Sequence, residues 1–76
     1  MTIAAANEVK KKLGERIRAL RQEKRLTGIQ LAQACGIRYP YLMNIEKGNH
    51  DLTLQDLVNI VTSLETTVSE LTEGIG

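Results

Sequence analysis

One glycine, Gly36, constrains this 76-residue chain more than any other residue, because it separates two predicted helices by a very tight turn. Thr27 can cap the first helix, which is predicted at residues 28–35. Gly36 then accepts the left-handed backbone that ends such a helix. The second helix is predicted at residues 39–47, and the small side chain of Ala32 stands where the two would cross. This spacing predicts a helix-turn-helix, in which the second helix projects from the surface.

Apolar residues continue at helical spacing on both sides of this pair, so the predicted fold class is all-α. Asn7 is a plausible N-cap for the first helix, and Thr53 and Thr67 begin capping-box-like patterns near the end of the chain. The expected helices cover residues 8–25, 28–35, 39–47, 54–64 and 68–72, within one domain of residues 7–72. Residues 1–6 are expected to form a mobile N-terminal segment and residues 73–76 a C-terminal tail.

The second helix of the pair has one inward and one outward face. Leu42 and Ile45 supply the inward side. The major groove of DNA admits one α-helix and shows a different donor and acceptor pattern for each base pair. The base-reading candidates on the outward side are therefore Arg38, Tyr39, Met43 and Asn44, and Lys47 is a candidate for the phosphate backbone. Four of these have a structural alternative: Met43 fills a gap beside the core, Asn44 faces solvent, the Tyr39 ring covers apolar surface, and Lys47 complements the helix dipole.

Charge is divided unevenly along the chain. Residues 1–50 carry ten basic and four acidic side chains, a net charge of +6, whereas residues 51–76 carry five acidic and no basic side chains, a net charge of −5. A basic half of this kind is typical of a protein that binds a polyanion. The alternative is a solvated helix surface with no partner.

The composition argues against several other classes of protein. Cys35 is the only cysteine, which excludes an internal disulfide and favours a reducing cytoplasm. The longest apolar run, residues 3–6, is far shorter than the ~20 residues of a membrane span. His50 stands alone in a loop, and no glycine-rich phosphate loop or paired carboxylate is present. We therefore expect no enzyme, no cofactor, no metal site and no membrane partner.

The segment "LGERIRALRQEKRLTGIQLAQACGIRYPYLMNIEKGN", followed by "LTLQDLVNIVTSLETTVSEL", resembles the Cro/C1-type (XRE-like) helix-turn-helix family. The likeness covers about residues 12–72, and chains of this length are similar to phage repressors and to the controller proteins of restriction-modification systems. It implies a five-helix, lambda-repressor-like domain that binds double-stranded DNA at a palindromic operator as a homodimer. It also implies an inward ion pair between Arg21 and Glu46.

Two features of the chain depart from that family. Gly28 stands where the second helix usually opens with a glutamine that clamps a phosphate, and Gln30 is the candidate that could reach the DNA backbone instead. Arg38 and Tyr39 stand where small or polar residues are common, and the ring of Pro40 would stiffen their turn. Tyr41 resembles a family tyrosine that packs and contacts phosphate, which makes it a second candidate for the DNA backbone.

The helix predicted at residues 54–64 has more apolar positions than one buried face needs. A second stripe predicts a two-fold interface built from Ile60, Leu64, Val68 and Leu71, although Leu64 could equally close the core of the monomer. A dimer bound at a promoter could repress transcription by blocking RNA polymerase or activate it by touching the polymerase. The alternative function is an antitoxin or phage-type repressor module whose main partner is another protein. A catalytic accessory is disfavoured because the sequence contains no recognisable site.

Overall fold

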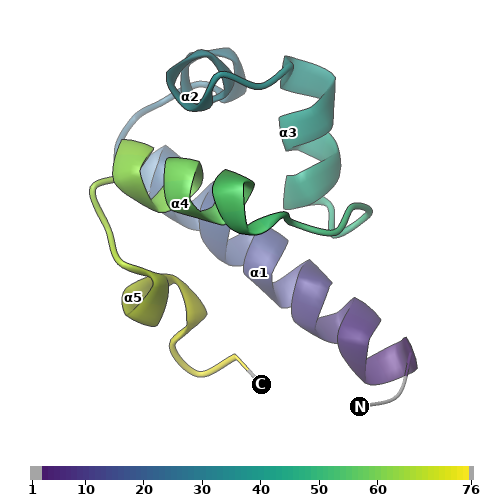
Figure 1. Cartoon of the computed structure of the whole chain (residues 1–76). Helices are drawn as coiled ribbons and strands as arrows, with labels where there is room; N and C mark the ends of the chain where they lie inside the picture. Colours follow the sequence, from purple (N-terminus) through teal and green to yellow (C-terminus); the bar gives the residue numbers. More distant parts are fainter. Residues whose placement is uncertain (1–2, 76) are drawn as a thin grey trace.

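The computed structural model describes residues 3–75 of the chain, with side chains from Ala5 onward, and it is all-helical over that range. The five helices are α1 (Ile3–Glu23), α2 (Gly28–Cys35), α3 (Tyr39–Glu46), α4 (Leu54–Ser63) and α5 (Val68–Thr72). Figure 1 shows α2 and α3 joined by a short turn at one end of the molecule, α4 crossing the long α1, and α5 below α4. Within residues 3–75, no helix is long and apolar enough to cross a bilayer.

The core is aliphatic, because the chain has only two aromatic residues and both are tyrosines outside the fully buried set. Every helix contributes to it. The buried apolar residues are Ile17, Leu31, Ala32, Cys35, Leu42, Ile45, Ile60, Val61, Leu64 and Leu71. Burying a side chain of the size of leucine or isoleucine stabilises a fold by about 1.5–3 kcal/mol, so this cluster holds the helix-turn-helix in place.

Local signals set the boundaries of α2 as the sequence predicts. The backbone N–H of Thr27 donates to Gln30 Oε1 at 2.8 Å, and the N–H of Gln30 donates to Thr27 Oγ1 at 3.1 Å, which completes a capping box. At the other end Gly36 has a φ of 69°, and its N–H donates to carbonyl oxygens of the last turn. α3 begins with Pro40 in its first turn and ends one residue earlier than predicted, with Lys47 as its C-cap.

Gly14 allows α1 and α3 to approach each other closely. A Cβ atom at this position would overlap the backbone carbonyl oxygens of Ile45 and Glu46, which end α3. The two helices therefore touch backbone to backbone at this crossing. This contact is the reason that a helix interior tolerates a residue with low helix propensity.

The ends of the chain differ from the prediction. α1 begins at Ile3, so the part of the expected mobile segment that is described, residues 3–6, is helical, and Asn7 lies inside the helix. Three consecutive alanines, which have the highest helix propensity of any residue, account for this extension. The tail is held as far as Ile75, because the Arg16 guanidinium donates to the carbonyl oxygens of Glu70 and Glu73 at 3.2 and 3.0 Å. Residues 1–2 and 76 lie outside the described residues.

The predicted two-fold interface is wrong for three of its four residues. Ile60, Leu64 and Leu71 are each 0% exposed, because they lie in the core, where α4 packs against α2 and α5 packs against α1 and α4. Side chains with no exposed surface in the monomer cannot form a contact between two copies. Only Val68, at 42% exposed, presents apolar surface.

Candidate nucleic-acid interface

The outward face of α3 carries the residues that the sequence predicts there. Leu42, Ile45 and Glu46 are buried against the rest of the fold. The opposite side of the helix presents Arg38, Tyr39, Pro40 and Lys47 as exposed side chains and Met43 and Asn44 as half-buried ones. Tyr39, Met43 and Lys47 recur every four positions, as do Pro40 and Asn44, so these residues share one face of the helix, whereas Arg38 is exposed directly before it as the N-cap residue.

This face borders an open groove of about 660 Å³ between α3 and α1. The groove is lined by Arg18, Arg21, Tyr39, Pro40, Met43, Asn44, Glu46 and Lys47. Arg18 is a residue that the sequence analysis missed. It stands three positions before Arg21 on α1, and this i,i+3 spacing was the signal that could have placed it on the same face.

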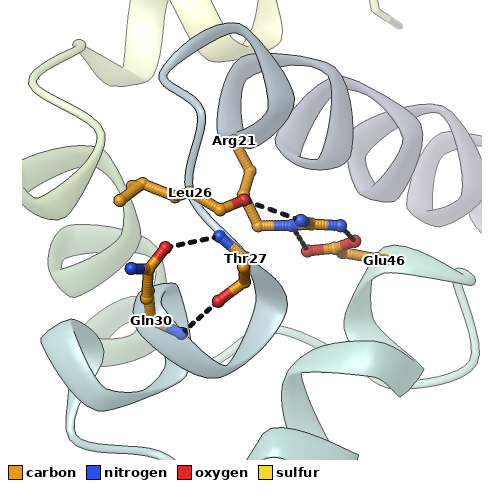
Figure 2. Close-up of polar contacts among 5 residues, drawn as sticks. All are labelled: Arg21, Leu26, Thr27, Gln30 and Glu46. Atoms are coloured by element: carbon orange, nitrogen blue, oxygen red, sulfur yellow. Dashed lines mark hydrogen bonds and ion pairs between the residues drawn. The ribbon is translucent and has the colours of Figure 1, made fainter.

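Arg21 and Glu46 join α1 to α3 at the base of this groove, and the ion pair that the family resemblance implied is confirmed (Figure 2). Arg21 Nε donates to Glu46 Oε2 at 2.8 Å, and Arg21 Nη2 donates to Oε1 at 3.0 Å. A third bond runs from Arg21 Nη1 to the carbonyl oxygen of Leu26 at 2.9 Å. The hydrogen bond to Glu46 raises the pKa of Arg21 above its ordinary value. The pair fixes the angle of α3 and takes Arg21 out of the set of cations free to bind a ligand.

The remaining cations fall into two groups. Three are paired with carboxylates: Lys10 with Asp51, Lys12 with Glu8, and Lys24 with Glu65. Arg16 is engaged by backbone carbonyls. The cations that make no ion pair or hydrogen bond with any residue in the described part of the chain are Lys11, Arg18, Arg25, Arg38 and Lys47. Three of these five, Arg18, Arg38 and Lys47, lie along α3 or its groove, which makes this face the unneutralised basic surface of the fold.

Arg38 lies directly before α3 as its N-cap residue. Its backbone is extended, with φ −76° and ψ 143°, and its side chain makes no capping hydrogen bond. The helix is held instead by the carbonyl of Arg38, which accepts from the N–H of Leu42 at 3.1 Å. The Arg38 guanidinium therefore does not take part in capping the helix and is free to bind a ligand.

Tyr41, a candidate for the DNA backbone, uses its hydroxyl in a hydrogen bond within the fold. Its hydroxyl donates to Asp56 Oδ2 at 2.5 Å, and its ring lies 5.4 Å, centroid to centroid, from that of the exposed His50. This hydrogen bond raises the pKa of Tyr41 and lowers that of Asp56. Because the hydroxyl hydrogen is already donated, and to a carboxylate that would repel phosphate, Tyr41 serves to fasten α3 to the start of α4.

Gln30, the other candidate for the DNA backbone, already uses the oxygen of its side-chain amide in a hydrogen bond within the fold. Its Oε1 accepts from Thr27 in the capping box, which leaves the Nε2 group of this exposed side chain with no hydrogen bond to a described residue (Figure 2). The sequence analysis did not assign the Gln30 side chain to the cap. The remaining N–H donors still suit a phosphate oxygen.

The fold and this face define a helix-turn-helix protein, and comparison with known proteins agrees. The family model described as "Helix-turn-helix domain" matches residues 12–73, so the chain belongs to that family. It is 39% identical over 64 residues to the HTH-type transcriptional regulator DdrOP3 of Deinococcus deserti, a match that covers 84% of this chain and 50% of the relative. It is 34% identical over 59 residues to the immunity repressor protein of Bacillus phage phi105, covering 78% of this chain and 41% of the repressor. The chain thus spans half or less of the length of these two curated relatives.

A solved structure is similar over nearly its whole length. The restriction-modification controller protein C.AhdI from Aeromonas hydrophila superposes with a TM-score of 0.78 at 31% identity, covering 80% of this chain and 92% of that chain. The likeness to a controller protein that the sequence indicated is therefore present in the fold as well. The structural similarity extends beyond α2 and α3 to 80% of this chain.

Proposed function

We propose that this protein is a sequence-specific DNA-binding transcription regulator that acts in the cytoplasm as a homodimer on a palindromic operator. The observation that carries the proposal is the outward face of α3. Its polar side chains, Arg38 and Asn44, make no hydrogen bond with any residue in the described range, and unpaired cations flank them. A named transcriptional regulator and a phage repressor among its relatives support the same function.

In this proposal α3 enters the major groove. Arg38 donates two parallel hydrogen bonds to guanine or holds a phosphate, and Asn44 makes two hydrogen bonds to adenine. Tyr39 offers its hydroxyl to a base or its ring to a thymine methyl group. Lys47 and Arg18 line the protein groove between α1 and α3, beside these base-reading residues, and contact the phosphate backbone of the DNA. Each phosphate contact releases counterions, so affinity falls steeply as salt is added.

The dimer requires an interface different from the one that the sequence suggested. The exposed large apolar side chains on α4 and α5 are Leu54 at 77%, Val58 at 44% and Val68 at 42%. Exposed apolar side chains of this kind are typical of a partner surface, and we propose that they meet their copies across a two-fold axis. The two α3 helices then enter major grooves about one turn, or ~34 Å, apart. The bound dimer blocks RNA polymerase or contacts it; a restriction-modification controller is one form of such a regulator.

Selection of bound sequences from a pool of random DNA duplexes tests this function. The expected result is a palindrome whose half-sites are centred one helical turn apart, with an affinity that falls steeply between 50 and 200 mM salt, as is typical of proteins that contact several phosphates. Enrichment of a single, unpaired half-site would contradict the dimer. No enrichment, together with only weak binding to any duplex, would contradict the function and point to a protein partner.

A further inference from the structure

Gly28 is not required by the backbone at its own position. It is the first residue of α2, directly after the N-cap residue Thr27, and it is not among the glycines with a left-handed φ. Glycine weakens a helix relative to alanine, and this position has none of the conformational demand that justifies Gly36. The reason for a glycine at this position must therefore lie in the space around it.

That space is filled from α3. A Cβ atom on Gly28 would lie 2.7 Å from Cε1 of the Tyr39 ring and 2.7 Å from the terminal methyl carbon of Met43, closer than real Cβ contacts. Tyr39 and Met43 are four residues apart on α3, so their side chains lie along one face of the helix. The missing side chain of Gly28 thus leaves a seat on α2 in which the edge of the Tyr39 ring rests, with Met43 beside it.

The seat holds only part of Tyr39. The side chain remains 44% exposed, and its hydroxyl makes no hydrogen bond within residues 5–75. A ring that is packed on one edge has fewer orientations to lose when it meets DNA, because its χ angles are already restricted. Met43, half-buried against the core, supports the ring.

We propose that Gly28 is a positioning residue for Tyr39, and that it sets the sequence preference of the recognition helix without touching DNA itself. This inference rests on the proposed function. A side chain at residue 28 would fill the space that the Tyr39 ring occupies, so the absence of one keeps the tyrosine in a fixed orientation at the start of α3. The specificity of the first base pair that α3 meets therefore depends on an α2 residue.

Gly28→Ala is the direct test, because the atoms that its Cβ would displace are the ends of flexible side chains and the fold can adjust. We expect the variant to lose about tenfold in affinity for the selected sequence, since one base contact contributes a factor of this order, and to change affinity for random DNA less than about twofold. Gln33→Ala is the matched control, because Gln33 is exposed on α2 and is not one of the residues that form the seat, and it should leave both affinities unchanged. In a Tyr39→Ala background, Gly28→Ala should have no further effect.

Nuclear Overhauser contacts between the Tyr39 ring protons and the Gly28 Hα protons, measured on the free protein, test the seat without DNA. Their presence is expected, and their absence would overturn the proposal. If the contacts are present but the selection enriches no sequence, the proposed function fails and this role fails with it. If a sequence is enriched and Gly28→Ala keeps the wild-type preference, or acts equally in the Tyr39→Ala background, only the role of Gly28 is wrong.

Discussion

Arg21 and Glu46 form a two-pronged ion pair between α1 and α3, and their side chains are only 12% and 4% exposed. Glu46→Ala would leave the Arg21 guanidinium without its partner in a largely buried place. We expect the free energy of unfolding to fall by about 3–5 kcal/mol, measured by urea denaturation followed by circular dichroism. The double variant Arg21→Met with Glu46→Leu should recover most of that loss. A loss below about 1 kcal/mol for Glu46→Ala would show that the pair is no more than a surface contact.

Gly14→Ala should destabilise the fold, although alanine is the better helix former by about 1 kcal/mol. The new Cβ meets the carbonyl oxygens of Ile45 and Glu46, which are backbone atoms and cannot rotate away, so α1 and α3 must separate. Overpacking of this kind costs about 1–3 kcal/mol, so after the gain in helix propensity we expect a net loss of about 1 kcal/mol by thermal unfolding. The neighbouring exposed Glu15→Ala is the control and should stay within about 0.5 kcal/mol of the wild type. A stabilised Gly14→Ala variant would rule out the backbone contact.

Arg38→Ala and Lys47→Ala separate base reading from phosphate contact. Arg38→Ala should weaken binding to the selected operator by about 1–3 kcal/mol and leave binding to random DNA nearly unchanged. Lys47→Ala should weaken binding to both and lower the slope of log affinity against log salt by about 0.9. Titrations of both duplexes at several salt concentrations measure the two effects. Identical behaviour of the two variants would refute these assignments.

Tyr41→Phe removes the hydrogen bond to Asp56 and should lower the free energy of unfolding by about 1 kcal/mol at neutral pH. The pKa of Asp56 is lowered in the fold, so its contribution is present above the ordinary aspartate value of about 4 and is lost as the pH falls through the folded value. The pKa of Tyr41 is raised, so its contribution is present below about 10 and is lost as the pH rises through the folded value. The difference between the two proteins should therefore shrink at both extremes.

Tyr39→Phe is the matched control for that comparison, because the Tyr39 hydroxyl has no hydrogen bond within the described residues. Its stability should remain within about 0.5 kcal/mol of the wild type from about pH 2 to about pH 12, a range that extends beyond the ordinary pKa values of aspartate and tyrosine. Urea denaturation across this pH range measures both variants. A Tyr41→Phe deficit that stays constant with pH would contradict the hydrogen bond between Tyr41 and the Asp56 carboxylate as its source.

Leu54→Glu tests the proposed dimer. Leu54 is the most exposed of the large apolar side chains, so a charge there should leave the monomer fold intact while placing two like charges near a two-fold axis. We expect sedimentation equilibrium to show a dimer for the wild type and a weakened dimer, by about tenfold or more in Kd, for the variant. Gln55→Glu adds the same charge at the next position and is the control. An unchanged Kd for Leu54→Glu would move the interface away from this part of α4.

The sequence determined the helix pair, because its signals are local. Thr27 and Gly36 act through hydrogen bonds within four residues, so the bounds of α2 could be predicted from the residues alone. The outward face of α3 followed from helical periodicity once Leu42 and Ile45 were assigned to the core. The Arg21–Glu46 pair was reachable only through the family resemblance, since 25 residues separate the two partners.

Only the tertiary structure decided which of two apolar stripes on α4 is buried. Both have helical spacing, and the choice depends on how α4 packs against α2 and α5: Ile60 and Leu64 lie in the core, whereas Leu54 and Val58 remain exposed. The hydrogen bond of the Tyr41 hydroxyl and the packing of α3 side chains on Gly28 could not be predicted from the sequence either. Each depends on a contact between residues that are 11 to 15 positions apart and lie in different helices. The spacing of apolar residues predicts that a helix has an apolar face, whereas the packing of segments distant in sequence determines which residues that face contacts.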